Sequence, residues 1–373
     1  MIHSWVNNLE INIAEYLDTL SKKENPYNFY PSKKDFTLNG ANLSLGFSCF
    51  AIKILYTLNL WDKLDANKKD SWSEYINSFQ KSKKGVPANS FVDDEIYNFY
   101  SKPDKTNLFK DKLKLLINLT DKNKFKTHNQ LFEEAIRAET KQAISTLNQI
   151  GYSNESQYSE FPFKKNDIFD FLYSLNWSKP WSAGGQFAAL SVFSKTQLQE
   201  DQYVNTSTFF SEFLNEIIDK ETGLYYLNSF ENRSEVINGT MKVITGLDWI
   251  NHEIHYPEKL IDFCLNTKPT NTGCDLVDIV YVLYKCLGQV EYKRNEIVKY
   301  MEEVLNLIYL HYKKDEGGFS YSIDKSQEYY YGLRITKGTN QADIHGTILL
   351  TWALSMIFFV QENEDFNWKI LKP

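Results

Sequence analysis

The chain has 373 residues, of which 42% are hydrophobic and 15% aromatic, so it holds ample apolar material for a large core. Its net charge is −7, and this acidic balance does not favour a nucleic-acid partner. The four cysteines form no CxxC pair, the first residues lack a signal-peptide pattern, and the longest apolar run (348–360) is too short to cross a bilayer. We therefore expect a cytoplasmic protein with a small-molecule substrate, no nucleic-acid partner and no membrane span.

Two kinds of helical segment alternate along the chain. Amphipathic segments, such as 11–20, 209–218 and 297–310, repeat apolar residues at helical spacing and would bury one face. A second kind is apolar almost all round, has small residues near its start, and would be buried on every side. Six segments of this second kind follow one another, at 43–58, 136–147, 184–193, 236–250, 275–287 and 344–360.

An outer ring of amphipathic helices around an inner ring of apolar helices satisfies both patterns. The predicted fold is therefore all-α, an (α/α)6-type toroid of helical hairpins around a central cavity, forming a single domain over 1–373. The lysine-rich stretch at about 60–128 is longer than one hairpin needs, which predicts a decorated hairpin or an insertion there. Strand signals are short and lie in connecting loops, at 223–227 and 318–322.

The C-terminal third carries a family resemblance. Asp315-Glu-Gly-Gly-Phe-Ser is followed by Ala342-Asp-Ile-His-Gly-Thr and an apolar helix, and Leu276-Val-Asp stands near the start of another predicted inner helix. Over residues 272–358 this pattern resembles the α/α-toroid superfamily of protein prenyltransferase β-subunits and squalene-cyclase-like enzymes.

The resemblance also bears on metal binding. In the prenyltransferases an Asp, a Cys and a His hold zinc; Asp278 and His345 match two of these positions, but Val280 stands where the Cys would be. Cys274, one helical turn before Asp278, is not at the family position. The Asp-x-Asp-Asp acid of the cyclase branch is absent as well. We therefore assign no cofactor and no metal, and zinc remains a secondary option that the missing thiolate disfavours.

The resemblance further implies that the N-terminal ends of the inner helices face the functional mouth, where several polar residues gather. Asp278 stands among apolar neighbours and His345 opens the most apolar helix, so each needs a buried partner or a chemical purpose. Lys242 lies in an apolar stretch and would pair with Glu139 or with an anionic ligand. We predict catalytic roles for Asp278, His345, Asp343 and Glu139, and ligand-binding roles for Arg137, Lys242, Asn238, Gln186, Asp275 and Trp181.

Each of these residues also has a structural explanation. Asp275 and Asp343 could cap their helices, Asp278 could belong to a buried pair, and His345 could be a core residue. Arg137 and Lys141 could point outward and pair with Glu133 or Glu134 at helical spacing.

The leading functional hypothesis is an enzyme that acts on a small or medium ligand in the central cavity. Isoprenoid chemistry, either prenyl transfer or terpene-like cyclisation, is favoured because aromatic side chains stabilise carbocations. The alternative is a carbohydrate-active enzyme, namely a glycoside hydrolase, polysaccharide lyase or sugar epimerase, using carboxylate and His acid–base catalysis. A third hypothesis is a non-catalytic binding or scaffold protein. The same helical ring serves all these chemistries, so the fold cannot choose among them.

Overall fold

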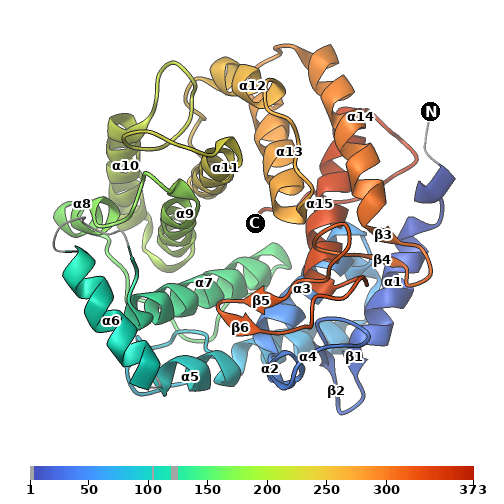
Figure 1. Ribbon diagram of the computed structural model, residues 1–373, viewed down its shortest axis with the longest axis horizontal. Helices are drawn as coiled ribbons and strands as arrows, with labels where there is room; N and C mark the ends of the chain where they lie inside the picture. Colours follow the sequence, from blue (N-terminus) through green and yellow to red (C-terminus); the bar gives the residue numbers. More distant parts are fainter. Residues whose placement is uncertain (1–3, 103–104, 119–124) are drawn as a thin grey trace.

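The computed structural model describes residues 4–102, 105–118 and 125–373, and it is mostly helical (Figure 1). Each helix of an inner ring packs on the next, and the last returns to the first, so that the ring is closed. The predicted α/α toroid is thereby confirmed. In ring order the inner helices are α3 (Leu45–Thr57), α7 (His128–Gln149), α9 (Pro180–Gln197), α11 (Arg233–Trp249), α13 (Gly273–Leu287) and α15 (Ile344–Val360).

Amphipathic helices form the outer layer. Helices α4, α10, α12 and α14 bury apolar residues against the inner ring, as expected for a helix with one buried stripe. Helix α4 packs on α3 and α7, α10 on α9, α12 on α13, and α14 on α13 and α15. The outer and short helices are η1 (Ser4–Val6), α1 (Leu9–Leu20), α2 (Leu38–Asn42), η2 (Trp61–Lys63), α4 (Ala66–Asn77), α5 (Asp94–Ser101), α6 (Lys105–Asn118), α8 (Lys165–Tyr173), α10 (Glu200–Ile217), α12 (Pro257–Leu265) and α14 (Arg294–His311).

The lysine-rich stretch at about 60–128 contributes several of these outer elements. Helix α4 covers α3 and α7, while α5 and α6 lie along α7. An isolated bridge between Gln80 and Phe91 ties the loop between α4 and α5 together. That this stretch is an insertion, and that the chain is a single domain over 1–373, remain predictions.

Helix α7 begins earlier than the apolar segment predicted at 136–147. Thr127 accepts a hydrogen bond from the backbone N–H of Gln130, and the Gln130 side chain accepts one from the backbone of Thr127. This capping box begins one continuous helix of 22 residues. The polar residues therefore mark a helix start, and the first turns of α7 extend beyond the apolar segment predicted at 136–147.

Strands are short and antiparallel in the described part of the chain. The prediction at 318–322 is confirmed by β4, while 223–227 holds only an isolated bridge between Ile218 and Tyr225. The first hairpin was not predicted, because its Lys- and Asn-rich sequence does not alternate in polarity. The paired strands are β1 (Ser21–Lys22) with β2 (Asn25–Phe29), β3 (Tyr312–Lys313) with β4 (Gly318–Phe319), and β5 (Tyr329–Tyr330) with β6 (Leu333–Arg334).

No helix within the described ranges combines the length and the apolar character needed to span a membrane.

Helices α9 and α11 approach each other more closely than side chains would allow. A Cβ atom on Gly239 would lie 2.6 Å from Cβ of Pro180. A Cβ atom on Gly184 would meet the backbone carbonyl oxygen of Gly239, which cannot move aside as a flexible side chain can. Glycine at both positions is therefore required by backbone contact between two inner helices.

We expect Gly184→Ala to lower the free energy of unfolding by about 2 kcal/mol, because overpacking against backbone outweighs the roughly 1 kcal/mol that alanine gains in helix propensity. Gly185→Ala, one residue along, is the matched control, since a Cβ there has no neighbour within 4 Å. That variant should be neutral or slightly stabilising. Denaturant titration of both variants measures the difference, and equal stabilities would contradict the close approach.

Candidate functional site

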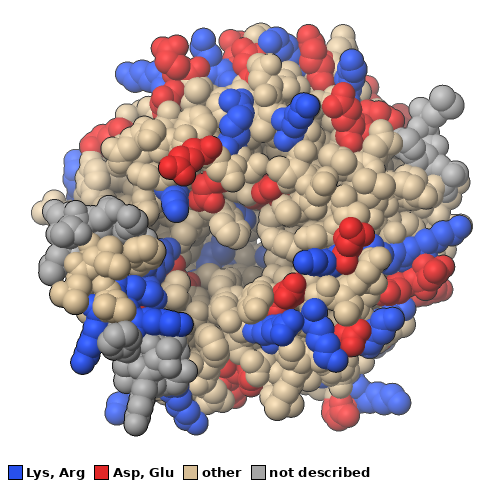
Figure 2. Space-filling view, viewed as in Figure 1, with Lys and Arg blue, Asp and Glu red and all other residues tan. Residues whose placement is uncertain are grey.

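The inner helices begin around one mouth of the ring. There Asn238 Nδ2 of α11 donates a hydrogen bond to Asp275 Oδ1 of α13 at 2.5 Å, and the His345 ring of α15 stacks on Phe50 of α3. Figure 2 shows that the molecule is hollowed at its centre, with Lys or Arg atoms at depth. We call this hollow the central cavity and define it by the residues described next: Phe50, Lys53, Lys141, Lys242, Asp278 and His345.

Three lysines from the inner helices α3, α7 and α11 lie close enough to act on one another electrostatically. Burial lowers the pKa of Lys53 to about 8, and the positive charge of Lys242 acts in the same direction. Burial, Lys53 and Lys242 together hold the pKa of Lys141 well below its usual value. Within the described residues, none of the three ammonium groups forms an ion pair or a hydrogen bond. The cavity therefore presents a concentration of positive charge that no carboxylate of the fold pairs directly.

His345 lies between two aromatic rings beside these lysines. Its ring stacks on Phe50 with centroids 4.7 Å apart and an interplanar angle of 5°, and on Tyr321 at 5.4 Å. Burial lowers the pKa of His345 to about 3, and the charges of Lys242 and Lys53 add to this effect. Its Nδ1 atom is buried and has no hydrogen-bond partner. The imidazole is thus neutral at neutral pH, and the fold provides no hydrogen-bond partner for its Nδ1 atom.

Asp278 provides a carboxyl group on the α13 wall. The side chain is only 2% exposed, and its Oδ2 atom has no hydrogen-bond partner. Burial raises its pKa to about 7, although the charge of Lys242 opposes the shift. Above it, the Tyr321 hydroxyl donates to Cys274 Sγ at 3.2 Å. At neutral pH Asp278 is therefore present in both protonated and ionised forms.

Glu139 is buried on α7 but does not form the predicted pair with Lys242. Its Oε2 atom accepts a hydrogen bond from the backbone N–H of Asp93 at 3.2 Å, and its Oε1 atom has no partner. Burial, reinforced by the charge of Asp93, raises the pKa of Glu139 well above its usual value. Glu139 lies against the backbone of Asp93 instead, so the predicted pair of Glu139 with Lys242 is wrong, and an anionic ligand remains the other predicted partner of Lys242.

Asp343 binds backbone groups of its own surroundings. Its Oδ1 atom accepts from the Gly346 N–H at 2.8 Å and caps α15. Its Oδ2 atom accepts from the N–H groups of Tyr321 at 2.7 Å and Gln327 at 3.1 Å. Asp343 thereby fixes the loop that carries Tyr321 over His345, and the geometry gives it a positioning role. A catalytic role for Asp343 remains a prediction that these contacts do not favour.

The remaining predicted ligand-binding residues lie at the rim. Arg137 donates to Gln186 Oε1 and places its guanidinium 4.9 Å from the centre of the Phe171 ring. Trp181 is 45% exposed at the start of α9. With neighbouring residues, Arg137, Phe171 and Trp181 line a surface cavity of about 360 Å³, which we call the rim pocket. Arg137 therefore does not make the outward pair considered from the sequence.

The zinc positions of the resemblance do not converge into a metal centre. Val280 is fully buried, and no hydrogen bond joins Asp278 to the His345 ring. Across the described ranges, no three His, Cys, Asp or Glu side chains are grouped so that they could hold a metal ion. Metal content remains a question for elemental analysis of the purified protein.

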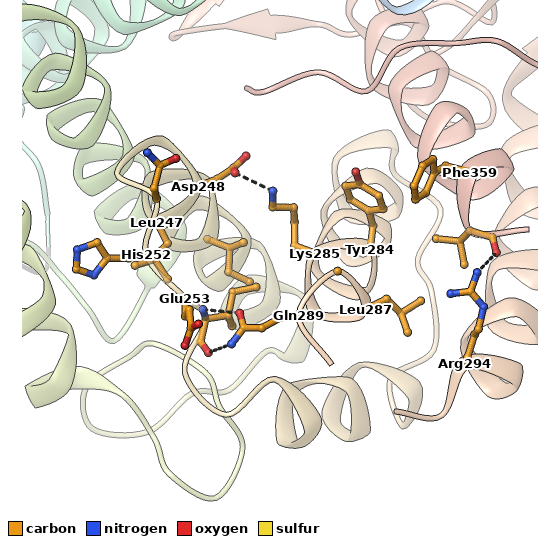
Figure 3. Close-up of a pocket in the computed structure, with 15 residues that line it drawn as sticks. Leu247, Asp248, His252, Glu253, Tyr284, Lys285, Leu287, Gln289, Arg294 and Phe359 are labelled. Carbon is orange, nitrogen blue, oxygen red and sulfur yellow. Dashed lines mark hydrogen bonds and ion pairs between the residues drawn. The ribbon is translucent and has the colours of Figure 1, made fainter. Parts of the chain in front are cut away.

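A second surface cavity, of about 490 Å³, lies at the opposite ends of the inner helices (Figure 3). An ion pair between Lys285 and Asp248 at 2.8 Å crosses it, and Gln289 donates to the Ile254 carbonyl. Its lysine and arginine are therefore paired, Lys285 with Asp248 and Arg294 with Glu362, unlike the lysines of the central cavity.

Sequence reasoning missed four residues of the site. Lys53 gives the signal that identified Lys242, a lysine inside an apolar helix, and could have been found in the same way. Lys141 could not have been found from the sequence, because the polar face of α7 gives no indication of which lysine points to the cavity. Phe50 and Tyr321 are ordinary aromatic residues until the ring brings them together on either side of His345.

No protein-family profile matches the chain, and no curated protein does. Among solved structures, the chain is similar to a polysaccharide lyase, with 12% sequence identity over 97% of this chain and 99% of that chain, and a TM-score of 0.47. Beyond the α/α-toroid fold, the resemblance of residues 272–358 to prenyltransferases and squalene-cyclase-like enzymes remains a prediction.

Replacing Lys53 with methionine should stabilise the ligand-free protein by about 1–3 kcal/mol at pH 7, because it removes a buried charge that other lysines repel. The pKa of Lys53 in the folded protein, about 8, lies below the ordinary lysine pKa of 10.5. Between these values the unfolded chain binds more protons, so the natural protein gains stability as pH rises. Lys53→Met should lack that gain.

Urea titrations at several pH values measure this difference. Lys299→Met removes an exposed lysine from α14 and serves as the control, with little expected change. A Lys53→Met variant that is less stable than the natural protein would show that the Lys53 charge is compensated in the fold.

Proposed function

We propose that the chain is an enzyme that acts on an acidic saccharide held in the central cavity. In the proposed reaction a proton is removed from the carbon next to the carboxylate, and the substituent on the following carbon is eliminated. The observation that carries this proposal is the meeting of three lysines without ion pairs and a neutral histidine in one cavity.

The lysines supply the electrostatic part. A carboxylate bound between Lys53, Lys141 and Lys242 would relieve their mutual repulsion and raise the pKa values of Lys53 and Lys141 towards their usual range. The same positive charge would stabilise the negative charge that develops on the carboxylate when the neighbouring C–H bond breaks. Because Lys53 is buried and Lys141 and Lys242 are partly buried, their charges act more strongly than they would in water.

Buried polar atoms without partners favour a hydroxylated ligand. Apart from the lysines, Glu139 Oε1, Asp278 Oδ2, His345 Nδ1, Tyr330 Oη and Asn238 Oδ1 have no hydrogen-bond partner. Each unpaired buried group costs about 1–3 kcal/mol, which a ligand rich in hydroxyl groups would offset. An isoprenoid chain would leave these groups unpaired, so their presence favours the carbohydrate hypothesis over the isoprenoid one.

His345 and Asp278 have pKa values suited to base and acid. Neutral His345 accepts the proton from the carbon next to the carboxylate, and the C–H electron pair becomes the new C=C bond. The C–O bond on the following carbon breaks, and its oxygen receives the proton of Asp278. The bound carboxylate offsets the lysine charges around His345, so the imidazole becomes a stronger base in the complex than in the free protein. Two groups driven to different pKa values in one cavity commonly divide the acid and base roles in this way.

Incubation with a panel of uronate-containing oligosaccharides and polysaccharides tests this function. Elimination gives an unsaturated, ultraviolet-absorbing product without added water, whereas hydrolysis gives a saturated product that has gained water. Prenyl diphosphates of several chain lengths form the parallel arm. Their turnover, with no saccharide converted, would overturn the proposal in favour of isoprenoid chemistry.

His345→Gln should lower kcat/KM by about 10²–10⁴ because it removes the base, and Lys242→Met should lower it by about 10²–10³ because one charge is lost. Lys285→Met is the matched control, since Lys285 lies on the neighbouring helix α13 but pairs with Asp248 at the far cavity. Steady-state rates and thermal melts of all three variants separate catalytic loss from misfolding. An active, folded His345→Gln enzyme would disprove the assigned base.

The pH profile follows from the pKa values of the free enzyme. Asp278, at about 7, must be protonated to act as the acid, and Lys53, at about 8, must be protonated to hold the carboxylate. Both forms are lost as pH rises, while His345, at about 3, stays neutral throughout. We therefore expect kcat/KM to fall as pH rises through about 7 to 8. A profile that climbs from neutral to alkaline pH would contradict these assignments.

A further inference from the structure

The C-terminal segment Phe366–Pro373 runs across the mouth of the ring opposite the rim. The Lys369 N–H donates to the Thr57 carbonyl at the end of α3, at 2.8 Å. The Lys372 N–H donates to Gln149 Oε1 at the end of α7, also at 2.8 Å. Trp249 Nε1, at the end of α11, donates to the Pro373 carbonyl at 2.7 Å. Contacts with α3, α7 and α11, which lie on different sides of the ring, bring the segment over the ring centre, where Figure 1 shows the C-terminal end.

Side chains fill the space between this segment and the lysines. Leu371 turns into the ring and is only 4% exposed. One or two helical turns beyond the cavity residues, Tyr281 of α13 and Trp352 of α15 are buried with ring centroids 5.2 Å apart. Thr57 and Ser145, which follow Lys53 and Lys141 by one turn, are fully buried. These residues and the segment together form a floor to the cavity.

The floor segment is itself held in place. Phe366 stacks on Phe358 of α15 with centroids 4.2 Å apart, and Trp368 packs against both rings. The Lys369 ammonium pairs with Asp62 Oδ2 at 2.5 Å. The segment is therefore a packed part of the fold, and its removal would expose aromatic side chains.

The lysines lie well below the rim. Lys53 is the ninth residue of α3 and Lys242 the tenth of α11, which puts them about 12–14 Å along their helices at 1.5 Å per residue. A carboxylate that reaches them must pass the rim and the His345 layer. Because the far mouth is floored, a polymer could not thread through the ring to bring an internal unit to this depth.

We propose that the enzyme acts on the end of a saccharide chain: the terminal acidic unit enters the central cavity, and the units behind it rest in the rim pocket. This inference rests on the function proposed above and specifies its substrate. It assigns the floor segment 366–373 the role of setting the mode of attack, and it assigns the rim pocket the role of a binding subsite for the next sugar units.

The rim pocket has the composition of a saccharide subsite. The exposed ring of Trp181 offers a flat apolar platform beside polar groups. Lys126 Nζ lies 2.6 Å from Ser182 Oγ and 2.7 Å from Glu134 Oε2, so these groups are held in fixed positions. Trp181 and Ser182 stand in the first turn of α9, at the open mouth and opposite the floor.

Two substrate sets test the mode of attack. The first is an acidic polysaccharide analysed for product size at early times. The second is a pair of matched oligosaccharides. One ends in free acidic units, and the other carries a neutral sugar at each end of the chain. We expect one short product from the start of the reaction, a slow fall in viscosity, and conversion of the free oligosaccharide alone. An early ladder of product sizes, or equal conversion of the blocked oligosaccharide, would overturn the inference while leaving the proposed function intact.

Calorimetry measures binding to the inactive His345→Gln variant. It distinguishes a failure of the chain-end inference from a failure of the acidic-saccharide function. Binding of the free but not the blocked oligosaccharide supports chain-end recognition, whatever reaction follows. Binding of neither oligosaccharide, nor of a simple uronate, would overturn the acidic-saccharide function itself.

Trp181→Ala should raise KM for tri- and tetrasaccharides about three- to tenfold and leave the shortest substrate unchanged, because only the longer chains reach the rim pocket. Phe359→Ala is the control, since Phe359 is 65% exposed but lies at the far cavity (Figure 3). Equal KM effects on all chain lengths would contradict the subsite.

Discussion

Three lysines are held close together by a closed ring of helices, and they repel one another. The rest of the site depends on this repulsion. Each of α3, α7 and α11 is fixed by two inner neighbours, so Lys53, Lys141 and Lys242 cannot move apart. The free-energy cost of this repulsion is offset by apolar contacts elsewhere in the fold, including the close packing of α9 on α11 at Gly184 and Gly239. A fold that keeps such an unfavourable arrangement resembles other active sites, where stability is given up for function.

Aromatic residues lie above the lysines and hold a histidine ring in a fixed position beside the positive charge. His345 is clamped between Phe50 and Tyr321, so its imidazole plane is fixed and its ordinary protonation is suppressed. Tyr321 reaches this position because Asp343 both caps α15 and binds the Tyr321 backbone. Asp343, for which a catalytic role or a cap was predicted, thus caps α15 and supports the loop that carries Tyr321 over His345.

The sequence predicts the ring because its inner helices are apolar on nearly every face, and such helices need neighbours all round. It predicts Lys242, Asp278 and His345 because each interrupts an apolar run. It cannot predict Lys141, since a helix whose first half is polar gives no sign of which side faces the axis. The pairing of Glu139 with Asp93, 46 residues earlier in the chain, depends on tertiary packing that periodicity does not encode. The position of segment 366–373 cannot be predicted either, because an irregular segment has no hydrophobic repeat that indicates where it packs.

A cavity with one open mouth must release its product by the route through which the substrate entered, and the proposed acid offers a means. Before reaction, protonated Asp278 leaves Lys242 free to bind the substrate carboxylate. Once Asp278 has given its proton to the leaving oxygen, a new carboxylate stands beside Lys242 and competes for its charge. His345 has gained a proton in the same reaction, so the new carboxylate of Asp278 and the new imidazolium of His345 cancel and the total charge of the cavity is unchanged. The Asp278 carboxylate still competes with the product carboxylate for Lys242, and the return of a proton from His345 to Asp278 through solvent restores the cavity for the next chain end.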